Sequence, residues 1–444
     1  MNRKINCTMF GILLSFAMAA ASPFRDGERV VFLGDSITAQ GAGGYIACLS
    51  TIYQSRYPGK TVRLYCAGVP GDTAGGGLKR LERDVLCRKP NRVFVWFGGN
   101  DLRYTLYAEE KQELSDKQRR EMAVCQKNLL QIYDRLKAAG ITVVAVTPTP
   151  FHYFHGEKNN YNEAGLAKLS DFIRKTAAER NMECIDLYQA MTEVLKRQPD
   201  IETYRKDKIH PDALGQLMIA YFILKQMNFD GMISNVQIDA ANASVIKAQQ
   251  AKIGNLKKTK TGIKFTYAPV RLPFYFTNKI HEQIDTLVPF TREMNSEILS
   301  ATGLEPGKYQ LKYGKTVLGR FSADELAQGI NLAGLRTPSY LTARKIAGTS
   351  SKLGNVQGKL RNVAKGDSLI GYDRIPKGLE ERAKAIDEIA AKMNSKYYYN
   401  VAKSYKVNIR NIDRLEKEME QLMDQLSSEC APKPFELTLE KLDK

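Results

Sequence analysis

The stretch Arg29-Val30-Val31-Phe32-Leu33-Gly34-Asp35-Ser36 decides the fold of this chain. Val30 to Leu33 form a continuous apolar run, which is typical of a strand that is buried on both faces. Ser36 follows this strand directly, before a helix that we expect to begin near Gly44. Open α/β sheets bind ligands beyond the carboxyl ends of their strands, so Ser36 is a candidate for chemistry.

Similar apolar runs recur along the chain and alternate with segments of helical length. The further strands are expected at 61–65, 92–97, 141–146 and 183–186, and the helices at 44–57, 74–88, 115–139, 161–180 and 211–227. Apolar strands that are separated by helices predict a parallel sheet covered on both faces. Residues 22–231 are therefore expected to form one α/β domain.

The rest of the chain has a different pattern. At 444 residues the chain is too long for one ordinary domain. We expect a helical linker at 232–258, because 236–258 reads as a polar helix, and then a small β-rich module at 259–333 with strands at 262–267, 272–276 and 297–301 and a hairpin at 308–321. Residues 334–444 are expected to be mainly helical, with amphipathic spacing in 380–427.

The N-terminus is typical of a secretory signal peptide. Arg3 and Lys4 precede an apolar run at 9–16, and Ala19-Ala20-Ala21 follows it. The run is too short to span a bilayer. We therefore predict that residues 1–21 are removed, and that the protein is exported to the periplasm or outside the cell without stable membrane insertion.

Charge and cysteine content narrow the classes of partner. The 66 basic and 48 acidic residues give a net charge of +18, but the basic residues are spread along the chain without a compact basic run. This distribution disfavours nucleic-acid binding and leaves attraction to an acidic polysaccharide or cell surface open. Beyond the signal peptide, most cysteines are expected to be buried free thiols, namely Cys48, Cys66, Cys87, Cys125, Cys184 and Cys430, although export permits disulfides. No protein partner is indicated.

A serine nucleophile requires a base, and His210 is the best candidate among only four histidines. Asp207 lies three residues earlier, where one loop can turn both side chains the same way. Its carboxylate would fix the imidazole tautomer and stabilise the imidazolium. The alternative is that Asp207 caps the helix expected from Pro211.

An acyl-transfer site also requires donors for the developing oxyanion. Gly71 follows the second strand and offers a backbone N–H, Asn100 follows the third and offers a side-chain N–H, and the amide of Ser36 is the third candidate. Gly71 and Asn100 are alternatively ordinary turn residues. Their positions after consecutive strands of one sheet favour the functional interpretation.

The chain contains a second copy of Gly-Asp-Ser, with which the first can be compared. Gly366-Asp367-Ser368 repeats the tripeptide, but it follows a polar segment instead of a strand, so we expect a surface loop there. In the first copy, we expect Asp35 to have a structural role and to bond the local backbone.

These segments together resemble the sequence blocks of the SGNH/GDSL hydrolases. The matching segments are Gly34-Asp35-Ser36-Ile37-Thr38, Gly71, Gly98-Gly99-Asn100-Asp101 and Asp207-Lys208-Ile209-His210, and the resemblance covers about 29–227. It implies a flavodoxin-like three-layer α/β/α fold, with Ser36 as nucleophile. It also implies an oxyanion hole of Ser36, Gly71 and Asn100, a triad completed by Asp207 and His210, and no metal or cofactor.

Segments beyond the α/β domain bear on the substrate. Segments 287–291 and 329–333 resemble the region after the SGNH domain in exported bacterial proteins linked to polysaccharide breakdown. We therefore expect a carbohydrate esterase that removes acetyl groups from an acylated glycan. His152, Tyr153 and His155 are candidates for contact with sugar rings, with loop packing as the alternative. A periplasmic lysophospholipase or thioesterase, and a non-catalytic glycan-binding protein, stay open as alternatives.

Overall fold

The computed structural model describes residues 22–102, 114–151, 163–275 and 278–442. The predicted signal peptide at 1–21 lies outside the described residues, as do His152, Tyr153 and His155. Within the described parts of the chain, no helix combines the length and the apolarity that a membrane crossing requires. All six cysteines that lie in these parts are free thiols.

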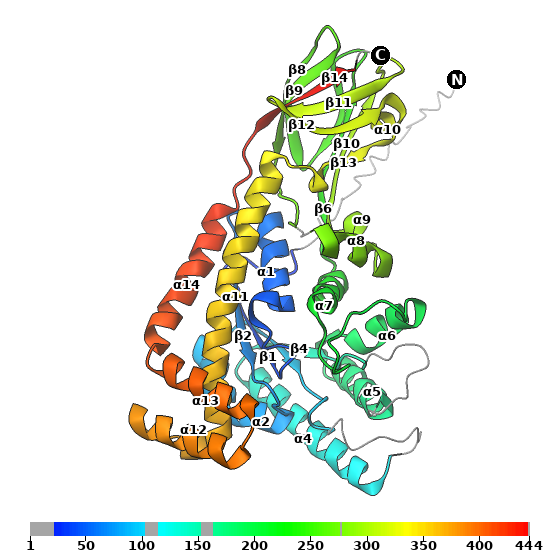
Figure 1. The fold of residues 1–444 in the computed structure, drawn as a ribbon. Coiled ribbons are helices and arrows are strands. Elements are labelled where there is room, and N and C mark those ends of the chain that lie inside the picture. The colour runs from blue at the N-terminus through cyan, green and yellow to red at the C-terminus, as the bar shows by residue number, and fades with distance from the viewer. Residues whose placement is uncertain (1–21, 103–113, 152–162, 276–277, 443–444) are drawn as a thin grey trace, which may run out of the picture.

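A five-stranded parallel sheet lies at the centre of the N-terminal half (Figure 1). Its strands in chain order are β1 (Arg29–Gly34), β2 (Arg63–Gly68), β3 (Arg92–Trp96), β4 (Thr142–Val146) and β5 (Glu183–Ile185). They lie in the order β2-β1-β3-β4-β5, which is the flavodoxin-like arrangement. This order confirms the fold that the apolar runs and the sequence blocks predicted.

Both faces of the sheet are covered by helices, because the strand residues that point to either face are apolar. Val30 and Phe32 face one helix layer, whereas Val31 and Leu33 face the other. The first layer contains α1 (Tyr45–Arg56), α6 (Leu187–Arg197) and α7 (Ala213–Gln226). The second contains α2 (Ala74–Lys79), α3 (Leu81–Asp84), α4 (Asp116–Ala138) and α5 (Glu163–Glu179).

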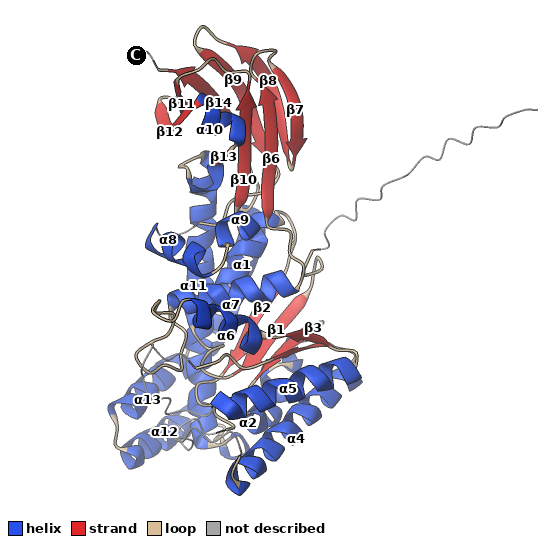
Figure 2. Cartoon of the chain, turned by 90° about the vertical axis from the view of Figure 1, so that its right-hand side faces the viewer, coloured by secondary structure: helices blue, strands red, loops and turns tan. Residues whose placement is uncertain are grey.

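A β-sandwich lies at the far end of the molecule (Figure 2). Its four-stranded sheet has the order β13-β10-β6-β7, from β6 (Met232–Asp239), β7 (Ser244–Gln249), β10 (Ser296–Thr302) and β13 (Ile330–Asn331). Its five-stranded sheet has the order β12-β11-β14-β9-β8, from β8 (Ala251–Lys258), β9 (Gly262–Pro269), β11 (Lys308–Tyr313), β12 (Thr316–Ser322) and β14 (Phe435–Lys441). The predicted hairpin at 308–321 is confirmed as β11 and β12, and Gly314 adopts a φ of +54° in its turn. The short helix α10 (Ala323–Gln328) completes this part. The helices α8 (Asn278–Leu287) and α9 (Phe290–Met294), which precede β10, pack instead into the core of the first helix layer.

The expected helical linker at 232–258 is wrong, because this segment forms β6, β7 and β8. Most residues of β7 and β8 are exposed, so these strands carry many polar side chains and have a composition similar to that of a surface helix. The strand expected at 272–276 is also not formed in its described part. Pro273 has no N–H for a sheet, and the N–H of Leu272 instead bonds the carbonyl of Ser55.

The first and the last of the four C-terminal helices pack along the edge of the central sheet, and the two helices between them pack against the first. The four helices are α11 (Pro338–Ile370), α12 (Leu379–Met393), α13 (Lys396–Ile409) and α14 (Ile412–Glu429), and α11 runs beside α14 (Figure 1). Gln357 of α11 accepts the N–H of Cys66 at 2.9 Å and donates to the carbonyl of Leu64 at 2.8 Å. Both partners belong to the edge strand β2, so α11 occupies main-chain groups that an edge strand otherwise leaves open.

The helix α11 also approaches the loop that follows β1. A Cβ atom on Gly354 would lie 2.6 Å from the Cα of Ala42, so only glycine permits this contact. The second Gly-Asp-Ser copy, 366–368, lies in the last turns of α11 and not in a surface loop as expected. Asp367 is buried there, because its carboxylate binds side chains from neighbouring helices.

Candidate active site

Ser36 lies immediately beyond β1, where close packing fixes the path of the chain. A Cβ on Gly34 would meet Thr38 Oγ1 at 2.4 Å and the carbonyl oxygen of Trp96 at 2.9 Å, so glycine is required before the turn. Asp35 Oδ1 accepts the N–H of Ile37 at 2.9 Å, which confirms the expected local backbone bond of Asp35. The turn therefore presents Ser36 at the carboxyl edge of the sheet.

Ser36, His210 and Asp207 form one hydrogen-bonded line. Ser36 Oγ lies 2.8 Å from His210 Nε2, and His210 Nδ1 lies 2.8 Å from Asp207 Oδ2. Both distances are within hydrogen-bond range. The arrangement can move a proton from the hydroxyl to the imidazole while the carboxylate faces the other ring nitrogen.

The loop before α7 holds the Asp207 carboxylate in place. Asp207 Oδ1 accepts the N–H groups of Ile209 and His210, both at 2.9 Å. Partial burial favours a higher pKa for Asp207, but these N–H groups and the imidazole outweigh it and lower the pKa. Asp212 caps α7 instead, by accepting the N–H of Gly215, so the cap alternative for Asp207 does not hold.

Three donors converge near Ser36 from loops that follow β1, β2 and β3. Gly71 has a φ of +75°, and neither its N–H nor that of Ser36 bonds another residue in the described parts of the chain. The Asn100 side chain donates to the carbonyl of Asp72 at 3.0 Å and to Asp35 Oδ2 at 3.3 Å. The two free amides can bind a developing oxyanion, and the longer Asn100 bond can be exchanged for one to the same oxygen.

Asp35 is buried behind these groups without a bonded cation among the described residues. Burial raises its pKa to about 7, although the Ile37 N–H and the charge of His210 oppose this change. Asp35 accepts from Asn100 and from its own turn, so it supports the donors without contacting Ser36 Oγ.

A pocket of about 550 Å³ opens above Ser36 and His210. Phe151, which begins the aromatic segment after β4, lines this pocket, whereas the other members of that segment are not described. Sequence reasoning missed several residues of the wall, namely Gln40, Arg205, Asn362, Lys365, Tyr397 and Val401. The last four belong to α11 and α13, and no sequence signal predicts that these helices reach the site.

Part of this chain is similar to known esterases and acylhydrolases. Residues 32–217 match the model of the GDSL-like Lipase/Acylhydrolase family. An acetylxylan esterase of Geobacillus stearothermophilus is 28% identical over 221 residues, which are 46% of this chain and 95% of that protein. An arylesterase of Vibrio mimicus is 30% identical over 99 residues, which are 21% of this chain and 46% of that protein.

The likeness extends beyond the α/β domain. The solved structure of a gut microbial diltiazem-metabolizing enzyme has a TM-score of 0.84 and 25% identity, and the match covers 95% of this chain and 99% of that one. Such coverage includes the β-sandwich and the C-terminal helices. The complete arrangement of the three parts therefore occurs in another protein.

Proposed function

We propose that this carboxylic ester hydrolase, whose residues 32–217 form a GDSL-like lipase/acylhydrolase domain, uses Ser36, His210 and Asp207 as a catalytic triad. The observation that carries this proposal is the line from Ser36 Oγ through His210 to Asp207, with 2.8 Å at each step. It lies at the carboxyl edge of a parallel sheet and opens into a pocket.

In the first step, Ser36 Oγ attacks the carbonyl carbon of the ester while His210 Nε2 takes the hydroxyl proton. Asp207 stabilises the imidazolium through Nδ1. The carbonyl oxygen becomes an oxyanion, which the N–H groups of Ser36 and Gly71 and the Asn100 side chain bind. His210 then gives the proton to the leaving alcohol, and an acyl-serine remains.

In the second step, water attacks the acyl-serine. His210 takes a proton from this water, and a second oxyanion forms at the same donors. Collapse of that intermediate releases the carboxylic acid, and the proton on His210 returns to Ser36 Oγ. The bond that Ser36 forms in the first step is broken in the second, so the residue is regenerated.

For the substrate, we propose a short acyl group, acetyl, on a carbohydrate. The similarity to an acetylxylan esterase supports this choice. The pocket wall also carries polar groups suited to sugar hydroxyls, from Gln40, Asn100, Arg205 and Asn362. Consistent with a glycan outside the cytoplasm, we propose export after removal of residues 1–21.

Two alternatives are separated by simple assays. A periplasmic lysophospholipase or thioesterase should prefer long acyl chains, whereas the proposed enzyme should turn over p-nitrophenyl acetate faster than p-nitrophenyl esters of long chains. A non-catalytic glycan-binding protein should hydrolyse neither. Release of acetate from a panel of acetylated polysaccharides tests the proposal directly, and a panel with no acetate release would reject it.

A further inference from the structure

Lys365 of α11 reaches the candidate active site from outside the α/β domain. Its Nζ atom lies 3.5 Å from the position that a Cβ on Gly71 would occupy, and the side chain lines the same pocket as Ser36 and His210. A positive charge is therefore held beside one of the proposed oxyanion donors.

The ammonium of Lys365 has no bonded partner among the residues that the structure describes. Asp72 is the carboxylate that acts on its charge, but Asp72 Oδ2 accepts from Arg80 Nε at 2.7 Å. Two other charged groups of the pocket are engaged, because Arg205 donates to Gln40 and Asp207 is bonded to His210. Asp35 also lines the pocket, but it accepts from the N–H of Ile37 and the side chain of Asn100 and not from Lys365. Partial burial lowers the pKa of Lys365, and Asp72 only partly opposes this.

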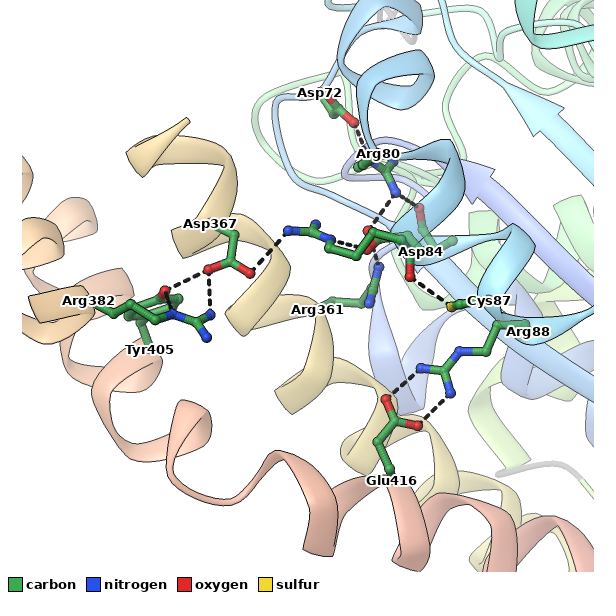
Figure 3. A network of polar contacts seen from close by, with 12 residues as sticks. Asp72, Arg80, Asp84, Cys87, Arg88, Arg361, Asp367, Arg382, Tyr405 and Glu416 are labelled. Carbon is green, nitrogen blue, oxygen red and sulfur yellow. Dashed lines mark hydrogen bonds and ion pairs between the residues drawn. The ribbon is translucent and has the colours of Figure 1, made fainter. Parts of the chain in front are cut away.

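Polar contacts hold α11 on both sides of Lys365 along the helix, and Figure 3 shows those of Arg361 and Asp367. Arg361, one turn earlier, donates to Asp84 Oδ2 at 3.1 Å. Asp367, two residues later, accepts from Arg83 at 3.1 Å. These bonds join α11 to α3, so the ammonium is held over the pocket by a rigid helix and not by a loop.

The residues Asp84 and Asp367 are also bound to further groups. Asp84 accepts from Arg80 at 3.1 Å and from Arg83 at 2.7 Å, and Asp367 accepts from Arg382 at 2.7 Å and from the hydroxyl of Tyr405 at 2.6 Å. These two carboxylates therefore already have cations of their own, which leaves Lys365 available to a ligand.

We infer that Lys365 binds an anionic group on the alcohol side of the ester, and that the substrate is an acylated acidic sugar such as a uronic acid. An unpaired charge in a partly buried site is costly unless a ligand compensates it, and a carboxylate does so with a charge-assisted hydrogen bond. Acetyl carries no charge, so the anion belongs to the alcohol part. Tyr397 of α13 lines the same pocket with 51% of its surface exposed, which suits contact with a sugar ring.

Lys365 has this role only if the site hydrolyses esters as proposed above, so the test uses a neutral ester as its internal reference. The matched substrates are the monoacetates of methyl glucoside and of methyl glucuronide, which differ by one carboxylate. The variants are Lys365→Gln, Lys365→Arg and, as control on the exposed side of the same helix, Lys359→Gln. Steady-state kinetics give kcat and KM for each pair, and thermal unfolding checks the fold.

We expect the unaltered protein to prefer the acidic ester. Lys365→Gln should lower the ratio of kcat/KM for the acidic ester to that for the neutral ester about 10- to 100-fold, mainly through KM, because a hydrogen bond to a charged group is lost. Lys365→Arg should restore part of the ratio, and Lys359→Gln should leave it unchanged.

Three results would overturn the inference. The first is that the unaltered protein does not prefer the acidic ester, and the second is that Lys365→Gln keeps the ratio of kcat/KM values of the unaltered protein. The third is that Lys365→Gln loses activity equally on both esters at an unchanged melting temperature, because this would place Lys365 at the oxyanion. Turnover of p-nitrophenyl acetate in these cases still supports the esterase. No turnover of any ester would reject both the esterase and the role of Lys365.

Discussion

Gly34-Asp35-Ser36 and Gly366-Asp367-Ser368 are the same three residues in two different regions of the molecule. The first copy follows a strand of the parallel sheet, and its serine bonds His210. The second copy lies in the last turns of α11, and its aspartate joins α11 to α3, α12 and α13. The role of the tripeptide therefore depends on the secondary structure in which it lies and not on its residue types alone.

The two aspartates show the difference most clearly. Both are buried, at 7% and 6% exposure. Asp35 bonds its own turn and Asn100, without a bonded cation among the described residues. Asp367 accepts from two arginines and a tyrosine. One carboxyl supports a site, and the other holds a helix in place.

The largest expected effect separates the two serines. Ser36→Ala should lower kcat for p-nitrophenyl acetate by about 10⁶-fold, because the nucleophile is lost, and should leave the melting temperature nearly unchanged. The matched control is Ser368→Ala, which should keep normal turnover. Normal activity in Ser36→Ala, or lost activity in Ser368→Ala, would mean that the wrong serine has been assigned.

The next effect concerns the donor that Asp35 supports. Asn100→Ala should lower kcat by roughly 10²- to 10³-fold, because one bond to the oxyanion is lost in the transition state. Steady-state kinetics with p-nitrophenyl acetate measure the loss. An increase in KM with an unchanged kcat would show that Asn100 binds substrate and does not stabilise the oxyanion.

A smaller effect, on stability, tests the role of Asp367 in the second tripeptide. Asp367→Ala should lower the free energy of unfolding by about 1–3 kcal/mol, because Arg382 and Tyr405 lose a buried acceptor. Denaturant unfolding gives this value. Asp373→Ala, at an exposed position after the helix, is the control and should stay within about 0.5 kcal/mol. Equal values for the two variants would contradict the role of Asp367.

The smallest expected effect is that of Asp35 on the pH dependence of the free energy of unfolding. Its folded-state pKa of about 7 exceeds the ordinary value of 3.8, so between these pH values the folded protein keeps a proton that the unfolded chain has lost. Stability from this group is therefore complete below about pH 4 and falls as pH rises through 7. Asp35→Asn removes this titration while keeping an acceptor for Ile37.

The free energy of unfolding should then decline less between pH 6 and 7 in Asp35→Asn, by about 1 kcal/mol. Denaturant unfolding at several pH values measures the slope. Some decline should persist, because burial also raises the pKa of Glu297 to about 7. The same slope in both proteins would show that Asp35 is ionised throughout.

Sequence alone predicted the α/β domain well because its signals are local. Each strand of the central sheet is a short apolar run, and the polar groups that follow β1, β2 and β3 must meet at one edge of a parallel sheet. The approach of Ser36 to His210 follows from this topology. The sequence also predicted that a strand precedes the first tripeptide and none precedes the second, although it misplaced the second in a loop.

The parts that sequence did not predict depend on contacts between distant segments. β7 and β8 are polar because most of their residues face solvent, so neither apolar periodicity nor composition revealed them. β6 does alternate buried apolar and polar residues at Val236 to Asp239, but the prediction extended the polar helix across it. Gln357 pairs with the main chain of β2, which leaves no pattern in side-chain types. Lys365 is one of 66 basic residues, and only the docking of α11 separates it from Lys359.

The placement of β14 has a consequence for how this chain is made. In the five-stranded sheet, β14 (Phe435–Lys441) lies between β9 (Gly262–Pro269) and β11 (Lys308–Tyr313), although α11 to α14 are synthesised in between. While the polypeptide emerges from the ribosome, the edges of β9 and β11 that pair with β14 therefore stay unpaired until α11 to α14 have been synthesised. The sheet is finished last, so a shortened product that stops after α14 has the helices but an open gap at the centre of its sandwich.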